Sequence, residues 1–254
     1  MPTVLITGAT SGIGAEFARS YADKGANLVL VARNRERLND TAHELRRSFG
    51  VTVEVLAADL LEASGCQQVE DRLNQNEAPV DILINNAGFG LSAPFPHSSI
   101  DDEERMLDIL VRVPLRLAYS AIPGMTARGR GAIVNVASVA ALLPTGTYGA
   151  AKAWLTAFSE SLRVDLAPSG VRVLAICPGF TRTEFHERAG MDMSAIPSWI
   201  WLDAGQVVGQ AMKDLARRRP LSIAGWWYKA YAQAVRHAPR VLAATMARSR
   251  TPRD

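Results

Sequence analysis

The stretch VLITGATSGIGA, residues 4–15, joins a short apolar run to a glycine-rich turn. The run at 4–7 is bounded by a glycine, which predicts a buried strand. A helical pattern then extends from residue 15 to residue 24, and Gly25 follows it. A strand, a glycine turn and a helix in this order let the backbone turn tightly and approach a phosphate group at the helix N-terminus. The alternative is a turn with a structural role alone.

The rest of the chain repeats the alternation of apolar strand and helix. Further strands are predicted at residues 27–31, 51–56, 82–84, 133–136, 171–176 and 221–223. Helices between them include residues 64–75, 101–122 and 204–218, and Pro114 should kink or break the second of these. This alternation, with right-handed crossovers, predicts a single doubly wound α/β domain built on a parallel sheet.

Composition is consistent with one large α/β domain. The chain has 254 residues, of which 48% are hydrophobic, so a sizeable core is available. Cys66 and Cys177 have neither metal-ligand spacing nor a disulfide framework, and we expect no metal site. No signal-peptide pattern and no apolar run of transmembrane length are visible. We therefore expect a cytoplasmic protein.

The positive charge is concentrated near the C-terminus. The whole chain has a formal charge of +3, but residues 213–254 contain ten Lys or Arg and two Asp, a net charge of +8. The preceding residues therefore carry a net charge of −5. A nucleic-acid-binding surface would be expected to involve the body of the domain as well, so we expect no nucleic-acid partner.

A second stretch, AIVNVASVAALLPTGTYGAAK at residues 132–152, contains the candidate catalytic groups. It begins as a buried strand and places Ser138 just beyond the strand's carboxyl end. Tyr148 and Lys152 are four residues apart, so they share one face of a helix. A neighbouring ammonium group should lower the pKa of the phenol, which makes Tyr148 a candidate proton donor or acceptor, with Ser138 beside it. The alternative is an ordinary Tyr–Lys pair on a solvated helix face.

These motifs together resemble the short-chain dehydrogenase/reductase family. The resemblance rests on Ser…Tyr-x-x-x-Lys, on the turn spacing G-x-x-x-G-x-G, and on Asn85-Asn86-Ala87-Gly88 at a strand end, and it covers roughly residues 3–223. It implies a Rossmann fold over residues 1–225, with a seven-stranded parallel sheet in the order 3-2-1-4-5-6-7 and a flap at 184–205. It also implies an oxidoreductase that interconverts a ketone and a secondary alcohol, and a homodimer or homotetramer.

The resemblance also implies roles for individual residues. Tyr148 would transfer the proton, Lys152 would lower its pKa and hold a ribose, and Ser138 would position the substrate oxygen. The gap of ten residues between Ser138 and Tyr148 is a few residues shorter than is usual in the family. A nicotinamide dinucleotide would contact Gly8, Thr10, Ser11, Gly12, Ile13, Gly14, Asp59, Leu60, Asn86, Ala87, Gly88, Tyr148, Lys152, Pro178, Gly179, Thr181 and Thr183.

Arg33 indicates which dinucleotide is preferred. NAD-binding sites place an acidic residue after the second strand, where it binds the ribose 2′-hydroxyl. Here Arg33 follows the strand at 27–31, and neither Asp nor Glu ends that strand. A guanidinium group can bind a 2′-phosphate in a bidentate manner, so we expect NADP(H). The alternative is a solvated arginine at the start of the next helix.

Leu110 departs from the family pattern. The resemblance implies an Asn at this position, where it helps to hold a water that links the catalytic Lys to solvent. Leucine offers no hydrogen bond, so proton resupply would take another route or be slow. The departure favours, to a small extent, a rival interpretation in which the chain is an NADP-binding regulatory or scaffold protein with little turnover.

The flap and the C-terminal segment suggest what else the protein contacts. Trp199, Ile200 and Trp201 make the flap apolar, which favours a lipid-like substrate such as a 3-oxoacyl group, a steroid or a similar ketone. Residues 226–254 form a basic extension, interrupted by Pro239, whose apolar stripe comprises Trp227, Tyr231, Ala234, Val235, Ala238, Val241, Leu242 and Met246. The stripe predicts a terminal helix packed over its own substrate pocket or a second subunit. Alternatives are a membrane-surface helix and a dock for an acidic carrier or a phosphate-bearing substrate.

Overall fold

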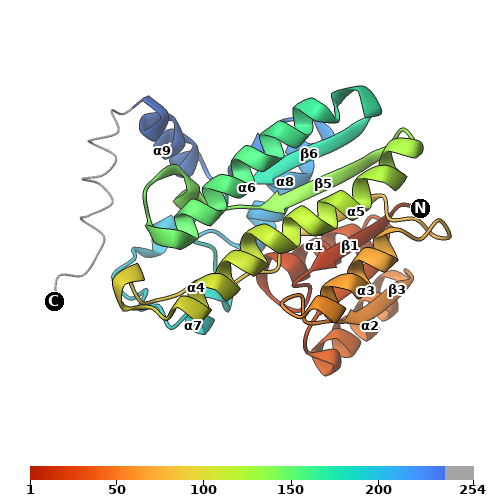
Figure 1. Ribbon diagram of the computed structural model, residues 1–254, viewed down its shortest axis with the longest axis horizontal. Helices are drawn as coiled ribbons and strands as arrows, with labels where there is room; N and C mark the ends of the chain where they lie inside the picture. The colour runs from red at the N-terminus through yellow and green to blue at the C-terminus, as the bar shows by residue number, and fades with distance from the viewer. Residues whose placement is uncertain (238–254) are drawn as a thin grey trace.

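A computed structural model of the chain describes residues 1–237 (Figure 1). Its centre is a parallel sheet of seven strands in the order β3-β2-β1-β4-β5-β6-β7, which confirms the predicted fold class and strand order. The strands are β1 (Thr3–Thr7), β2 (Asn27–Ala32), β3 (Val53–Ala57), β4 (Ile82–Asn85), β5 (Gly131–Val136), β6 (Val171–Ile176) and β7 (Leu221–Ser222).

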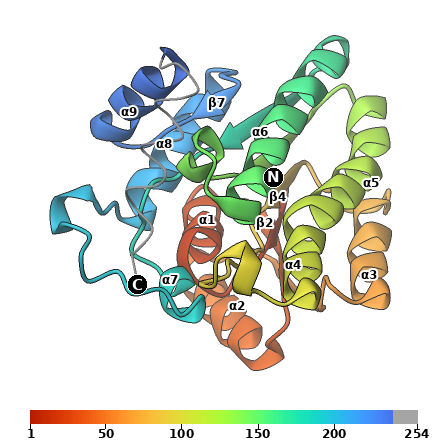
Figure 2. The ribbon, with the colours of Figure 1, turned by 60° about the vertical axis from the view of Figure 1, so that its left-hand side comes forward.

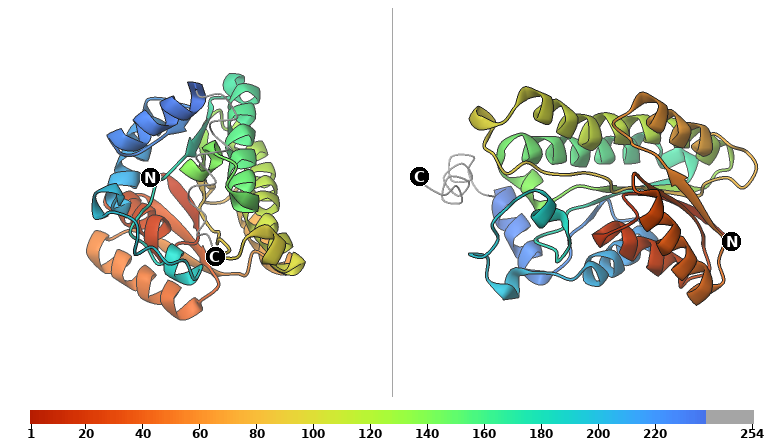
Figure 3. Two further views of the ribbon diagram at one scale, coloured as in Figure 1. Left: turned by 90° about the vertical axis from the view of Figure 1, so that its left-hand side faces the viewer. Right: turned by 90° about the horizontal axis from the view of Figure 1, so that it is seen from below.

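Helices cover both faces of the sheet (Figure 3). One layer contains α1 (Gly12–Ala22), α2 (Arg35–Phe49) and α8 (Ala204–Ala216), and the other contains α3 (Ala63–Leu73), α4 (Ile100–Leu107), α5 (Val113–Ala127) and α6 (Gly146–Asp165). The short α7 (Phe185–Arg188) and α9 (Trp226–His237) follow the later strands. Among residues 1–237, no helix is long and apolar enough to span a lipid bilayer.

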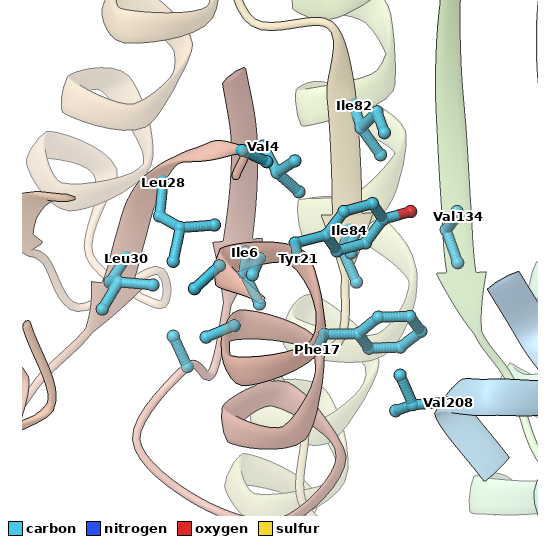
Figure 4. Close-up of a cluster of buried hydrophobic side chains, with 14 of the residues drawn as sticks. Val4, Ile6, Phe17, Tyr21, Leu28, Leu30, Ile82, Ile84, Val134 and Val208 are labelled. Carbon is cyan, nitrogen blue, oxygen red and sulfur yellow. The ribbon is translucent and has the colours of Figure 1, made fainter. Parts of the chain in front are cut away.

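The sheet separates two hydrophobic cores. Val4 and Ile6 of β1 point toward α1, where they pack with Phe17 (Figure 4). Leu5, between them, belongs to the cluster on the opposite face. These three side chains of β1 are completely buried, and each contributes about 1.5–3 kcal/mol of transfer free energy. A continuous apolar run is therefore what a strand covered on both faces requires.

Pro114 changes the helical register instead of breaking the helix. α4 ends at Leu107, a π-helical segment occupies Asp108–Arg112, and α5 begins at Val113 with Pro114 in its first turn. The amide of Val113 donates to the carbonyl of Asp108. Proline has no N–H, so it is tolerated at the start of a helix. The π segment inserts the additional residue that carries the chain from α4 into α5, and Leu110 lies inside it.

α9 packs on the turn that follows β6. Tyr228 is buried, its hydroxyl accepts from the amide of Phe180 at 2.9 Å, and it donates to the carbonyl of Ile200 at 3.0 Å. A Cβ at Gly179 would lie 2.0 Å from Cζ of Tyr228, so only glycine fits there. The described part of the tail thus packs on its own domain. Residues 238–254, with Pro239 and the rest of the predicted stripe, lie outside the described residues.

The buried face of α9 differs from the predicted stripe. Tyr228 and Ala232 are buried, whereas Trp227 and Ala234 are exposed. The prediction counted apolar character alone. The phenol of Tyr228 has two hydrogen-bond partners in the turn, and this pairing favours its burial over that of the larger Trp227.

We predict that Gly14→Ala destabilises the fold. A Cβ at Gly14 would lie 2.1 Å from the carbonyl oxygen of Gly8 and 2.5 Å from Nδ2 of Asn86. The clash should cost about 1–3 kcal/mol and lower the Tm by several degrees, measured by calorimetry. The control is Gly209→Ala in α8, where a Cβ would meet no atom within 4 Å; it should raise stability by about 0.5–1 kcal/mol. Equal Tm changes in the two variants would contradict this account.

Candidate active site

The glycine turn after β1 lies at the carboxyl edge of the sheet. Gly8 and Gly12 have φ values of +67° and +54°, which favour glycine. A Cβ at Gly12 would lie 2.8 Å from Cγ2 of Thr183. The segment that follows β6 is therefore in direct contact with the turn that follows β1. α1 begins at Gly12, and the first amides of a helix attract anions. The turn therefore fits a dinucleotide phosphate.

Asn86 holds this turn in place. Its side-chain amide donates to the carbonyl of Thr7 at 2.9 Å and to that of Gly8 at 3.2 Å. The hydroxyl of Thr7 accepts from the amides of Asn86 and Ala87 at 2.9 and 3.0 Å. The ends of β1 and β4 are thus cross-linked by side chains. The sequence motif Asn85-Asn86-Ala87-Gly88 lies where the prediction placed it, at the end of β4.

A buried polar chain continues from β4 across β5. Nδ2 of Asn85 donates to Oδ1 of Asn135 at 2.8 Å, and Nδ2 of Asn135 donates to the hydroxyl of Ser159 on α6 at 2.9 Å. Asn85 and Asn135 are register partners in the sheet. Buried amides are usually hydrogen-bonded, and the bond from Asn135 to Ser159 helps to specify how α6 is seated on the sheet.

The structure brings Ser138, Tyr148 and Lys152 together beyond the carboxyl end of β5. Ser138 lies beside Tyr148, and its hydroxyl acts to lower the pKa of the phenol. Nζ of Lys152 lies 5.8 Å from the centroid of the Tyr148 ring and donates to the carbonyl of Val136 at 2.6 Å. Lys152 is only 5% exposed. One hydroxyl, one phenol and one ammonium group thus converge in a confined site.

The short gap between Ser138 and Tyr148 is closed by a compact loop. Residues Val139–Leu142 form a 3₁₀ helix, and the hydroxyl of Ser138 accepts from the amide of Ala140 at 3.1 Å. The hydroxyl of Thr145 donates to the carbonyl of Ala140 at 3.1 Å. The loop therefore turns back within ten residues and keeps Ser138 beside Tyr148.

The pKa of Tyr148 differs from the expected direction. Burial raises it to about 12, although the hydrogen bond from Ser138 acts in the opposite sense. Burial also lowers the pKa of Lys152 to about 8. The prediction counted the attraction of an ammonium for a phenolate and not the desolvation of both groups. At neutral pH the phenol is protonated, as a proton donor must be.

Leu110 lies beside Lys152, where the family resemblance placed it. A Cβ at Gly88 would lie 2.6 Å from Cδ2 of Leu110 and 4.0 Å from Nζ of Lys152. The side chain of Leu110 is 1% exposed. An apolar group therefore occupies the space between the end of β4 and the lysine.

Residues 184–205, the predicted flap, place one aromatic side chain against Tyr148. The ring of Phe185 lies 5.9 Å from that of Tyr148, and Phe185 and Met191 both approach Gly90. His186 lies 5.2 Å from the Trp201 ring, and burial lowers its pKa. The face of the flap above Tyr148 is apolar.

Arg33 and Asp59 lie at the ends of β2 and β3. Their charged groups are 4.0 Å apart, and the Arg33 side chain is 71% exposed. Arg33 is therefore free to turn toward a bound anion. Oδ1 of Asp59 accepts from the amide of Leu61 at 3.0 Å, which fixes the carboxylate at the strand end.

Sequence reasoning missed Arg37 and Tyr228. Arg37 on α2 donates to the carboxylate of Glu184 in the flap and to the carbonyl of Thr10 in the glycine turn. A hint was the run Arg33, Arg35, Arg37, in which only the first was considered. The predicted apolar stripe contained Trp227 and not Tyr228, because tryptophan is the more apolar of the two residues.

Comparisons with known proteins agree with this geometry. A family model described as short chain dehydrogenase matches residues 2–193. Sulfoacetaldehyde reductase 2 of Chromohalobacter salexigens is 40% identical over 199 residues, which are 76% of this chain and 78% of the relative.

Two solved structures extend the likeness over most of the chain. A short-chain dehydrogenase of Sphingobium yanoikuyae in complex with NADPH has a TM-score of 0.88 and 38% identity, covering 100% of this chain and 97% of the other. The bulky-bulky ketone specific alcohol dehydrogenase of Comamonas testosteroni has a TM-score of 0.81 and 33% identity, covering 93% and 92%. The chain thus belongs to the short-chain dehydrogenase/reductase family and is an oxidoreductase acting on CH–OH and C=O groups.

Proposed function

We propose that the protein is an NADP(H)-dependent oxidoreductase that interconverts a bulky, apolar ketone and its secondary alcohol. The observation that carries the proposal is the convergence of Ser138, Tyr148 and the buried Lys152 beyond the end of β5. These groups lie at the carboxyl edge of a parallel sheet, where ligands of doubly wound folds bind.

Each of the three side chains has a distinct task in this proposal. When bound, the nicotinamide cofactor supplies or accepts the hydride. Tyr148 donates its proton to the carbonyl oxygen during reduction, and Ser138 holds the same oxygen by a second hydrogen bond. Lys152, with a pKa of about 8, can return a proton toward Tyr148 near neutral pH.

Three features support NADP(H) over NAD(H). Arg33 directly follows β2, its side chain is mostly exposed, and no acidic residue ends that strand. A guanidinium matches the geometry of a phosphate ester. The related Sphingobium enzyme was solved with NADPH.

The apolar flap supports the choice of substrate. Phe185 packs against Tyr148, and Met191 approaches Gly90 beside Phe185. Trp201 joins the same aromatic group through His186. The Comamonas relative is named for its specificity toward bulky ketones, whereas the name of the Chromohalobacter relative refers to a small sulfonated aldehyde. A large apolar ketone, such as a 3-oxoacyl ester or a steroid ketone, matches the flap better.

The rival function, an NADP-binding regulatory or scaffold protein, fits these observations less well. Such a protein has no need for a buried lysine beside a phenol and a serine hydroxyl. Burying the ammonium of Lys152 is energetically costly, and the cost is understandable if the group moves protons. Leu110 changes the surroundings of Lys152 and leaves Tyr148 and Ser138 untouched.

We predict that Tyr148 is the proton donor. Tyr148→Phe keeps the ring and removes the hydroxyl, so turnover of bulky ketones with NADPH should fall by about 10²–10⁴-fold. NADPH binding, followed by cofactor fluorescence, should persist. Tyr119→Phe is the matched control, because Tyr119 is 79% exposed on α5. Ketone reduction by Tyr148→Phe at more than a tenth of the wild-type rate would place the chemistry elsewhere.

We predict that Arg33 determines the choice of cofactor. Wild type should bind NADPH more tightly than NADH, and Arg33→Asp should reverse the preference, because a carboxylate repels the 2′-phosphate and accepts from a 2′-hydroxyl. Arg35→Asp, which makes the same charge change two residues later, should keep the preference for NADPH. Equal affinities of wild type for the two cofactors, measured by fluorescence titration, would refute the assignment.

We predict that Leu110 limits the resupply of protons to Lys152. Leu110→Asn introduces an amide beside Lys152 that can hold a water, so turnover should rise or stay unchanged. A buried amide without partners costs stability, so the Tm should fall and must be measured alongside. Leu110→Ala removes the same packing without an amide and should not raise turnover. A sharp loss of turnover in a folded Leu110→Asn variant would show that leucine has a positive role in the site.

A further inference from the structure

A cluster of charged side chains joins the flap to the glycine turn. Figure 2 shows α7, in the flap, beside α2. Two bonds connect the guanidinium of Arg37 on α2 to the carboxylate of Glu184, at 3.2 and 2.9 Å. Nη2 of Arg37 also donates to the carbonyl of Thr10 at 3.2 Å. One arginine thus touches both the flap and the phosphate-binding turn.

Glu184 is shared between two arginines. Arg188, four residues later, pairs with the same carboxylate, and its Nη1 lies 3.4 Å from the hydroxyl of Ser11. The hydrogen bond from Arg37 is the largest cause that lowers the pKa of Glu184, so this carboxylate is ionised at neutral pH. Both arginines therefore lie within reach of the turn and share one carboxylate between them.

The charge balance of this corner favours an additional anion. Arg33, Arg37 and Arg188 contribute three positive charges, and Asp59 and Glu184 contribute two negative ones. All of these side chains are partly exposed, so the groups can rearrange. A phosphate ester is a strong bidentate partner for a guanidinium. Arg37 is already held at the turn by the carbonyl of Thr10.

We propose that Glu184 competes with the 2′-phosphate of the cofactor for Arg37, so that Arg37 and Glu184 together set the affinity for NADP(H). This inference rests on the proposed use of NADP(H). When the phosphate binds Arg37, Glu184 stays paired with Arg188. The carboxylate of Glu184 therefore keeps one cationic partner. Glu184 is a positioning residue that acts through Arg37, and it links the affinity of the phosphate site to the place of the flap.

The test uses two probes that differ by one phosphate group, 2′,5′-ADP and 5′-AMP, with the full chain and calorimetric titration at low salt. Arg37→Gln should raise the Kd of 2′,5′-ADP by about tenfold, because a charge-assisted bidentate contact is lost. Glu184→Gln should lower that Kd by about threefold, the scale of an exposed ion pair. Neither variant should change the Kd of 5′-AMP by more than about twofold.

Two controls isolate the contact from the general field. Glu187→Gln removes a negative charge from an exposed residue of α7 and matches Glu184→Gln. Arg35→Gln removes a positive charge from α2 and matches Arg37→Gln. Each should change the Kd of 2′,5′-ADP much less than its partner variant. In the Arg37→Gln background, Glu184→Gln should have no larger effect than Glu187→Gln, because its effect passes through Arg37.

The outcomes separate this inference from the proposed cofactor. If wild type binds 2′,5′-ADP no better than 5′-AMP, the preference for NADP(H) fails and the inference fails with it. If Arg33→Asp abolishes the preference but Glu184→Gln weakens 2′,5′-ADP or leaves it unchanged, only the competition by Glu184 is overturned. An equal gain in 5′-AMP binding in Glu184→Gln would also overturn it, because the effect would then not depend on the 2′-phosphate.

Discussion

The ammonium group of Lys152 is buried, and it donates to the carbonyl of Val136 at the end of β5. A buried charge is tolerated only where hydrogen bonds replace the lost water, so this bond ties α6 to the carboxyl edge of the sheet. Tyr148 lies one helical turn earlier on the same face and is held over that edge. The same burial that secures the lysine also lowers its pKa to about 8 and keeps the phenol of Tyr148 protonated at neutral pH.

The site is then completed by segments far apart in the sequence. Asn86 cross-links the ends of β1 and β4, and Thr183 after β6 packs on Gly12 after β1. Tyr228 from α9 supports the turn below the flap through its hydroxyl. Each contact uses a small residue or a single polar side chain. The chemistry of the sheet edge therefore depends on four strands and two later segments at once.

Much of the fold was predictable because local patterns are strong here. Continuous apolar runs predicted the strands, and the observed bounds differ from the predicted ones by at most two residues. Pro114 was correctly seen as a perturbation of the helix. The form of the perturbation, a change to π-helical hydrogen bonding over Asp108–Arg112, was not predicted, because it depends on packing that a local pattern does not contain. The face of α9 was misjudged for a similar reason, because the partners of the Tyr228 hydroxyl come from residues 180 and 200.

The sequence by itself determined the family and placed Ser138, Tyr148 and Lys152 beyond one strand and on one helix face, because these follow from motifs and spacing along the chain. The strand order then followed from the resemblance to the family. Only the tertiary structure decided the direction of the two pKa shifts, since desolvation depends on what surrounds a group and not on its neighbours in sequence. It also decided that Arg37 faces Glu184, a pair separated by 147 positions. Spacing in sequence reveals which groups can share a helix face, whereas burial and long-range pairing arise when the chain folds back on itself.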